Sequence, residues 1–315
     1  MKKISLVIPF FNEEANVSTT LAVIEDVVSD MPQYEWELVA INDGSRDRTL
    51  DTLTAYSPRV LQLVVVDLSR NFGKEAALSA GLAQASGDAI VPLDADLQDP
   101  PSLIPELLAQ WEAGFEVVLA RRVDRSSDSF LKRTTAHVFY RTINRMSDIR
   151  IPENVGDFRL MDRVVVNVLN SLPESRRFMK GLFAWAGFRT TAVEYVRPER
   201  AAGETKFNSW RLWNLAVEGI TSFSTAPLRF WTYLGFAVAS CAFVYGVYII
   251  ARTLLHGVDV PGYASLLSVI LFVAGIQLIG LGILGEYLGR VYVESKQRPP
   301  FVIRKVTRSK SASTE

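Results

Sequence analysis

The sequence predicts an α/β fold in which a doubly wound, mostly parallel sheet is followed by amphipathic interface helices and two transmembrane helices. Three observations support this prediction. Short β-rich runs alternate with helical patterns through residues 4–120, polar clusters follow those runs, and two long uncharged apolar segments lie in the C-terminal third. Strands that alternate with helices indicate a parallel sheet, because parallel neighbours need a crossover connection.

The individual elements are expected from periodicity and from turn residues. Residues 4–10 form a short apolar run that contains Pro9 and meets Asn12-Glu13-Glu14 without a small-residue cleavage site, so we expect a first strand rather than a signal peptide. Further strands are expected at residues 36–42, 60–68, 89–93 and 115–120, and helices at residues 13–31, 47–56, 73–85 and 102–113.

Composition excludes few functions but constrains some. The 315 residues carry 34 basic and 34 acidic side chains, so net charge indicates no nucleic-acid partner. A single cysteine, Cys241, excludes an intramolecular disulfide and a cysteine-based zinc cluster. We expect Cys241 to act as a small hydrophobe within its apolar segment.

Polar clusters follow the predicted strands at Asn12-Glu13, residues 43–45, Arg70-Asn71 and Asp94/Asp96. Each cluster alone is compatible with an ordinary turn. In an open parallel sheet, however, all the carboxyl ends lie at one edge, and ligands bind there. We therefore expect these clusters to converge on one site.

Asp94 and Asp96 are two residues apart, so both side chains point to the same face of an extended segment. Two carboxylates at a strand end suit a hard divalent cation that keeps positions open for phosphate oxygens. The alternative is a solvated acidic turn. Asp43, held by the Gly44 turn, could accept the imide N–H of a uracil, although the same pair is also typical of a tight turn before a helix.

The motifs that carry these clusters resemble those of a known family. They are V-I-P-F-F-N-E at residues 7–13, N-D-G-S-R-D at residues 42–47, S-R-N-F-G-K at residues 69–74 and L-D-A-D-L-Q-D at residues 93–99. In order and spacing they resemble family 2 glycosyltransferases, and most closely the polyprenyl-phosphate branch, which includes dolichyl-phosphate mannose synthases and bactoprenol glucosyltransferases. The resemblance covers about residues 1–230.

The resemblance implies a GT-A fold, an activated nucleotide-sugar donor, a divalent metal (Mg²⁺ or Mn²⁺) and a lipid-phosphate acceptor. By matching position it implies these nucleotide-binding residues: Pro9, Phe11, Glu13, Asp43, Lys74 and Asp94. It implies metal binding by Asp96, Asp94 and Gln98, with Asp96 the firmer ligand.

On the acceptor side, the resemblance implies that a strand-end arginine, Arg122 or the adjacent Arg121, meets the acceptor phosphate. Arg133 is a further candidate on residues 130–146, which suit a helix at a membrane surface or one packed on the domain. Asp157 matches an acceptor-side acid. Because a lipid phosphomonoester is already largely dianionic, Asp157 is either a general base or a positioning group.

A glycine-containing loop carries Arg200 and Lys206, and it resembles a family segment that could close over the donor diphosphate. A solvated charged loop is the alternative. The candidate catalytic residues are therefore Asp157, Arg122, Lys206 and Arg200.

Residues 231–251 contain no charge and span about 31 Å at ~1.5 Å per residue, which matches a hydrocarbon core. Flanking basic residues predict that both termini lie in the cytoplasm of a bacterial-type inner or plasma membrane. The expected divisions are a catalytic domain at residues 1–206, juxtamembrane helices at 207–230, spans at 231–252 and 264–289, a non-cytoplasmic loop at 253–263 and a basic, lipid-attracted tail at 290–315. Glycines in the second span suggest homo-oligomer contacts.

The resemblance, together with the predicted spans, implies inverting transfer of a sugar, most simply glucose because the spans and loop pattern resemble bactoprenol glucosyltransferases, from a UDP-sugar to undecaprenyl phosphate at the cytoplasmic membrane face. The product would serve glycan or lipopolysaccharide modification. Alternatives are another donor (GDP-mannose or a UDP-amino sugar), a processive polysaccharide synthase, and a non-catalytic scaffold that binds nucleotide sugars. The Gln-x-x-Arg-Trp motif of processive synthases is absent from the sequence.

Overall fold

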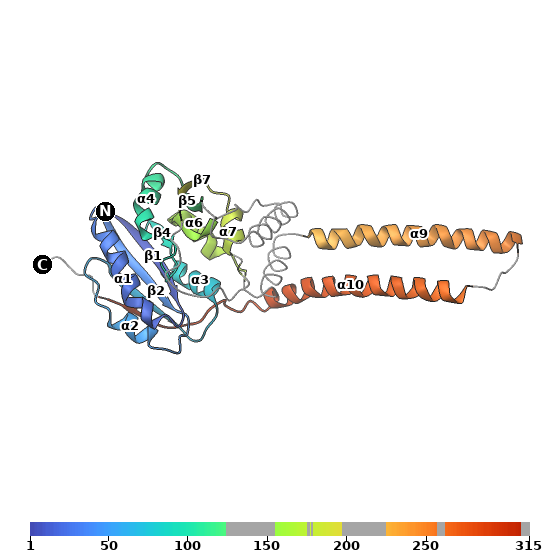
Figure 1. The fold of residues 1–315 in the computed structure, drawn as a ribbon, viewed down its shortest axis with the longest axis horizontal. Helices are drawn as coiled ribbons and strands as arrows, with labels where there is room; N and C mark the ends of the chain where they lie inside the picture. Colours follow the sequence, from blue (N-terminus) through green and yellow to red (C-terminus); the bar gives the residue numbers. More distant parts are fainter. Residues whose placement is uncertain (124–154, 175–176, 178, 197–224, 257–261, 310–315) are drawn as a thin grey trace.

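An eight-stranded mixed sheet forms the centre of the N-terminal domain, and a long helical hairpin extends from it (Figure 1). The computed structural model describes residues 1–123, 155–174, 177, 179–196, 225–256 and 262–309. The strand order is β7-β5-β6-β4-β1-β2-β3-β8. The predicted interface helices at residues 130–146 and most of residues 207–230 lie outside the described residues.

The first half of the chain alternates strands with helices as predicted. Its elements are β1 (Lys2–Phe10), α1 (Glu14–Ser29), β2 (Tyr34–Asn42), α2 (Thr49–Ala55), β3 (Gln62–Leu68), α3 (Lys74–Gln84), β4 (Ala89–Pro92), η1 (Pro101–Leu103), α4 (Ile104–Glu112) and β5 (Val117–Arg122). Strands β4, β1, β2 and β3 are parallel neighbours, which confirms the predicted parallel centre of the sheet.

The second half adds seven described elements, most of which the sequence patterns do not predict. They are β6 (Val155–Asp162), α6 (Arg163–Ser171), α7 (Met179–Trp185), β7 (Thr190–Tyr195), α9 (Ala226–His256), α10 (Tyr263–Ser295) and β8 (Ile303–Arg308). Only α9 and α10 among them correspond to predicted segments, the two apolar spans. Strand β6 lies antiparallel between β4 and β5, and β8 lies antiparallel on β3. The sheet is therefore parallel at its centre and mixed overall.

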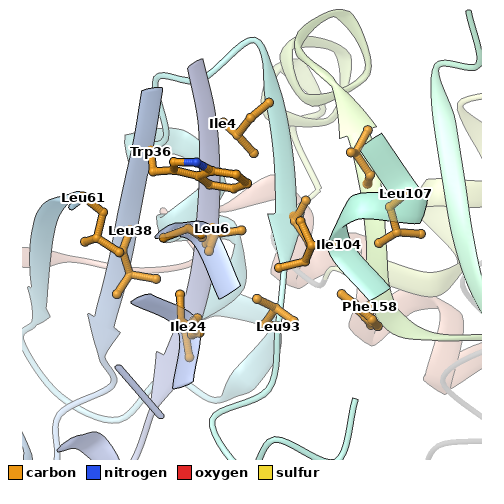
Figure 2. Packing of buried hydrophobic residues seen from close by; sticks show 14 of the residues in the cluster. Ile4, Leu6, Ile24, Trp36, Leu38, Leu61, Leu93, Ile104, Leu107 and Phe158 are labelled. Carbon is orange, nitrogen blue, oxygen red and sulfur yellow. The ribbon is translucent and has the colours of Figure 1, made fainter. Parts of the chain in front are cut away.

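Two hydrophobic cores cover the two faces of the sheet. Alternation along β1 sends Ile4, Leu6 and Ile8 to one core, which α1, α2 and α4 close, and Val7 to the other, which α3, α6 and α7 close. Figure 2 shows the first core, where Leu6 and Leu38 lie between Trp36 and Ile24. Full burial of each such side chain contributes about 1.5–3 kcal/mol.

The hairpin consists of α9 and α10, which run side by side away from the sheet (Figure 1). Both contain a stretch long and apolar enough to cross a membrane, Leu228–His256 and Phe272–Ser295. Near the start of α9, the Trp231 ring packs on Gly280, where an added Cβ would lie 3.6 Å from the indole.

The basic C-terminal segment differs from its prediction as a lipid-attracted tail. Residues up to Ser295 continue α10, and residues 303–308 form the edge strand β8 of the sheet. The Ser69 N–H donates to the Val302 carbonyl at 2.9 Å, and the Ser309 N–H donates to the Leu63 carbonyl at 2.8 Å. The chain therefore returns from the hairpin to the domain from which it left.

Candidate active site

The carboxyl ends of β1, β2, β3 and β4 meet around a cavity of about 360 Å³. This size lies within the usual range of small-molecule sites. Its lining residues are Pro9, Phe10, Phe11, Glu13, Asp43, Asn71, Gly73, Lys74, Asp94, Ala95 and Asp96. The predicted convergence of the polar clusters is thus confirmed, and every residue predicted to bind the nucleotide lies in this lining.

Hydrogen bonds between loops fix the wall formed by Phe11 and Glu13. The Asn12 N–H donates to the Ser45 hydroxyl at 3.0 Å, and the Arg46 N–H donates to the Asn12 side chain at 2.9 Å. The Glu13 N–H donates to the Thr49 hydroxyl at 3.0 Å. The loops after β1 and β2 are therefore one unit, and the Phe11 ring stays 43% exposed beside the cavity.

Asp43 holds the loop that follows β3. Its two carboxylate oxygens accept the N–H groups of Phe72 at 2.7 Å and Gly73 at 3.0 Å. Burial raises the pKa of Asp43, and these two backbone donors oppose the shift. The predicted contact to a uracil stays a prediction. The structure adds an anchoring role, and each oxygen retains a second lone pair for a ligand.

Lys74, the first residue of α3, joins the segment after β4 to strand β6 by two ion pairs. Its ammonium lies 2.6 Å from an Asp94 oxygen and 2.7 Å from an Asp157 oxygen. Burial alone lowers the pKa of Lys74, but the carboxylates of Asp157 and Asp94 outweigh burial and raise it. Burial raises the pKa of Asp94, and Lys74 opposes that shift. Asp157 therefore lies at the same site as Asp94, although β6 carries it.

Asp96 and Gln98 follow Asp94, with Asp96 exposed and Gln98 half-buried. The Gln98 N–H donates to Asp96 Oδ1 at 3.1 Å. Leu97 between them has a positive φ of 52°, which a non-glycine residue rarely adopts and which is common at functional sites. Gln98 Oε1 is buried and lacks a hydrogen-bond partner among the described residues.

These residues fit a divalent cation whose remaining ligands are water and substrate oxygens. The described residues contain no group of three or more His, Cys, Asp or Glu side chains placed to hold a metal alone. Mg²⁺ usually takes one or two protein carboxylates and completes its shell with water and substrate phosphates. Asp94, Asp96 and the partnerless Gln98 Oε1 offer such an incomplete set.

The structure separates the two arginines at the end of β5. Arg121 forms an exposed ion pair with Glu194 at 2.8 Å. Arg122 instead lies beside buried Asp99, with 3.5 Å between Nη2 and Oδ1, and its Nε–H donates to the Tyr195 hydroxyl at 3.2 Å. A Cβ on Gly156 would lie 3.9 Å from Arg122 Nη2, so Arg122 stands next to the segment that carries Asp157.

Asp99 precedes η1 closely but does not cap it. The residue that precedes η1 is Pro100, without a side-chain cap, and Asp99 Oδ1 accepts the Tyr195 hydroxyl at 2.5 Å. Burial and this bond raise the pKa of Tyr195 to about 12, so the phenol stays protonated at neutral pH. Tyr195 itself carries no motif by which the sequence could identify it.

Arg159 is a buried cation that the motifs do not reveal. It is 4% exposed, lies over the Phe183 ring at 3.9 Å, and donates to the carbonyls of Gly156 at 2.6 Å and Asp157 at 3.3 Å. Burial lowers its pKa to about 10, so it remains charged at neutral pH. In the sequence, the one feature that links Arg159 to the site is its position two residues after Asp157, which puts both side chains on the same face of a strand. Arg133, Arg200 and Lys206 lie outside the described residues.

Comparison with known proteins decides the family. Residues 5–169 match glycosyl transferase family 2, and residues 226–291 match the GtrB C-terminal hairpin. The chain belongs to glycosyl transferase family 2. The polar edge of its sheet is thus the candidate active site of a glycosyltransferase, and the sheet is GT-A-like.

Curated relatives resemble this glycosyltransferase over nearly the whole chain. It is 54% identical to the "Prophage bactoprenol glucosyl transferase homolog" of Escherichia coli (strain K12), covering 96% of this chain and 99% of that protein. It is also 54% identical to the "Bactoprenol glucosyl transferase" of Shigella phage SfV, covering 96% and 98%.

Among solved structures, glucosyl-3-phosphoglycerate synthase from Mycobacterium tuberculosis, in complex with Mn²⁺ and UDP-glucose, is similar. It is 21% identical, with a TM-score of 0.46 and coverage of 70% of this chain and 78% of that one. A likeness of this size carries no argument about ligands.

Proposed function

We propose that this glycosyltransferase transfers glucose from UDP-glucose to undecaprenyl phosphate with inversion at C1, giving a polyprenyl-phosphate sugar for glycan or lipopolysaccharide modification. One observation carries the proposal: the identity of 54% to bactoprenol glucosyl transferases extends over 96% of the chain and includes the hairpin. A relative that resembled this chain only in its nucleotide-sugar-binding domain would give no support for the acceptor. These relatives resemble it in that domain and in the hairpin.

The donor nucleoside lies along the ends of β1 and β2, where Pro9, Phe11, Glu13 and Asp43 line the cavity. The exposed Phe11 ring offers an apolar face for the base. Lys74 lies at the diphosphate end, where its ammonium offsets charge on the leaving UDP. Asp96, Asp94 and Gln98 would hold Mg²⁺ or Mn²⁺, which when bound stabilises the departing diphosphate.

The acceptor phosphate meets Arg122 from the other side, because Arg122 lies beside Gly156 and Arg121 is engaged by Glu194. A phosphate oxygen attacks C1 as the bond from C1 to the UDP oxygen breaks on the opposite face. The acceptor is already largely dianionic, so little proton removal is required. The ion pair of Asp157 with Lys74 at 2.7 Å therefore favours a positioning role for Asp157 over that of a general base.

In this proposal the hairpin holds the site at a lipid bilayer. Helices α9 and α10 cross the membrane, and the domain and the C-terminal strand both lie on the cytoplasmic side. The pairing of β8 with β3 supports this arrangement, because a strand beyond α10 reaches the sheet only if α10 ends on the side of the domain. The polyprenyl chain then stays in the bilayer while its phosphate enters the site.

The test is transfer in isolated membranes. Membranes that contain the full chain are incubated with Mg²⁺ or Mn²⁺, undecaprenyl phosphate and separate nucleotide sugars, and the lipid product is identified by mass. We expect a hexosyl product with UDP-glucose. A product only with GDP-mannose or a UDP-amino sugar would replace the donor, and transfer that does not need lipid phosphate would refute the proposal.

The Asp96→Ala variant separates an enzyme from a binding scaffold. We expect product formation to fall by at least about a hundredfold, as for loss of a group that stabilises the leaving charge. Binding of UDP, measured by calorimetry on the purified chain, should persist in weaker form. Unchanged transfer by this variant would contradict the metal-site assignment.

A further inference from the structure

Arg122 contacts two buried side chains, Asp99 and Tyr195, and the three residues come from three separate parts of the chain. Arg122 ends β5, Tyr195 ends β7, and the two are direct partners in the parallel register of these strands. Asp99 comes from the loop between β4 and η1. Asp99 and Tyr195 lie in the interior, at 4% and 7% exposure, whereas the Arg122 side chain is 27% exposed.

The contacts within this set define the orientation of one guanidinium group. Arg122 Nε–H donates to the Tyr195 hydroxyl at 3.2 Å, and that hydroxyl donates to Asp99 Oδ1 at 2.5 Å. Arg122 Nη2 lies 3.5 Å from the same Asp99 oxygen. A planar guanidinium that is held at two of its nitrogens has a fixed plane, and a planar fork recognises phosphate only in a defined orientation.

The surroundings of Tyr195 hold its ring independently of its hydroxyl. The Phe158 ring meets it edge to face, with centroids 6.4 Å apart. Removal of the hydroxyl alone therefore leaves the packing of the ring in place. It removes two hydrogen bonds, the one from Arg122 Nε–H to the hydroxyl and the one from the hydroxyl to Asp99 Oδ1.

We propose that Tyr195 and Asp99 are positioning residues for the acceptor, which direct the Arg122 guanidinium toward the phosphate of the polyprenyl substrate. This inference rests on the proposed function, in which Arg122 meets that phosphate. It gives the segment at residues 94–99 two separate roles. Asp94 and Asp96 serve the donor, while Asp99 serves the acceptor through Arg122.

The decisive variant is Tyr195→Phe in the full chain. We expect KM for undecaprenyl phosphate to rise about tenfold, the equivalent of one hydrogen bond to a charged group, while KM for UDP-glucose stays within about twofold. Equal increases in both KM values, or no change in either, would overturn the inference, because a merely structural role would not separate the two substrates.

The matched control is Tyr56→Phe. Tyr56 donates to buried Glu25 at 2.9 Å, and Arg59 Nε lies 3.3 Å from the same carboxylate. This variant therefore removes a tyrosine hydroxyl from a similar tyrosine, carboxylate and arginine set that lies outside the site. Both variants should lower the apparent melting temperature by similar amounts. Only Tyr195→Phe should change KM for the lipid phosphate, and a similar change in Tyr56→Phe would overturn the inference.

A double-mutant cycle tests whether Tyr195 acts through Arg122. In an Arg122→Lys background the Nε–H donor is gone, so adding Tyr195→Phe should raise KM for undecaprenyl phosphate by less than about twofold. Fully additive effects would overturn the inference. If the unsubstituted chain transfers no sugar to lipid phosphate, the proposed function fails and this inference fails with it. An active unsubstituted chain with an unaffected Tyr195→Phe variant refutes the inference alone.

Discussion

Gly44 shapes the proposed donor site, because its lack of a side chain lets the loop after β3 approach closely. Its φ is +63°, and a Cβ at this position would lie 2.3 Å from the Arg70 carbonyl carbon and 2.4 Å from the Asn71 nitrogen. Both are backbone atoms, so no side-chain rotation relieves the contact. The turn after β2 must therefore carry glycine for the loop after β3 to approach it.

The Gly44→Ala variant should destabilise the domain by about 2–4 kcal/mol, because backbone strain and a steric clash add together. It should also raise KM for UDP-glucose, since the displaced loop carries Gly73 and Lys74. The control is Gly114→Ala, where φ is +95° but the nearest atom is Arg189 Nη1 at 3.8 Å. Thermal unfolding compares them, and equal losses in both variants would show that the clash contributes nothing.

The environment of Glu37 makes the unfolding free energy depend on pH. It is 3% exposed and accepts hydrogen bonds from the Ser5 hydroxyl at 2.5 Å and from Ser86 N–H at 2.8 Å, and Lys3 Nζ lies 3.3 Å away. Burial raises the pKa of Glu37, but these hydrogen bonds and Lys3 outweigh it, so the pKa lies below the ordinary value of 4.5. The contribution to stability is present above pH 4.5 and is lost as the pH falls through the lower, folded-state pKa.

The Glu37→Gln variant should lose about 2–3 kcal/mol of unfolding free energy at pH 7, because a charged acceptor is removed from buried donors. The difference from the unsubstituted chain should shrink as the pH falls below 4.5. The control is Glu35→Gln. The Glu35 side chain is 59% exposed, and its carboxylate forms a longer ion pair with Lys3, at 3.7 Å. Unfolding midpoints at pH 7 and at low pH measure the effect, and a pH-independent difference would contradict it.

The part of the candidate site that could be predicted from the sequence consists of residues that directly follow the predicted strands. Asp43, Lys74, Asp94 and Asp96 follow strands of a parallel sheet, so topology alone brings them together. Asp99, Tyr195 and Arg159 could not be found in this way, because burial and cross-strand pairing define them. Tyr195 faces Arg122 only because β7 pairs with β5, and the sequence does not reveal that pairing.

At the scale of elements, β8 connects the hairpin to the proposed donor site. Arg304 lies 3.3 Å from Asp67 Oδ2 and donates to the Ser69 carbonyl at 2.7 Å. Asp67 in turn accepts from Asn42 at 2.8 Å, and Asn42 accepts the Ser45 N–H at 3.2 Å. A path of hydrogen bonds therefore runs from β8 to the turn that holds Asp43.

The sequence does not predict β8 because its residues, I-R-K-V-T-R, are typical of a solvated basic tail. Its partner strand lies far away in the chain, with 237 positions between Arg304 and Asp67. Central strands, by contrast, carry apolar runs buried on both faces and are predictable from those runs.

The Arg304→Ala variant should raise KM for UDP-glucose by about threefold, the effect of one partly exposed ion pair, while kcat changes little. Amide hydrogen exchange should increase at residues 67–73. Lys305→Ala on the same strand is the control, because Lys305 is exposed like Arg304 but forms no ion pair among the described residues. Equal effects of the two substitutions would show that β8 acts only through its positive charge and that the Arg304 contacts do not hold the loop after β3.

At the scale of the whole molecule, the return of the chain to its own sheet requires an even number of membrane crossings between residues 225 and 303. Large apolar side chains along α9 and α10 are exposed in the isolated chain, among them Phe243, Leu254 and Phe272. Water would oppose such exposure, whereas lipid favours it. Two crossings satisfy both the apolar surface and the pairing of β8 with β3.

The lone cysteine makes this arrangement measurable. In a Cys241→Ser background, cysteines are introduced singly as Asp51→Cys in the domain, His256→Cys at the end of α9 and Arg298→Cys before β8. In intact cells, a membrane-impermeant maleimide should label only the His256→Cys chain, and all three should react after the membrane is opened. Labelling of Arg298→Cys from outside would mean that α10 ends on the far side of the membrane. Strand β8 could then not pair with the sheet of its own chain, and the path from the hairpin to the donor site would not exist in the membrane.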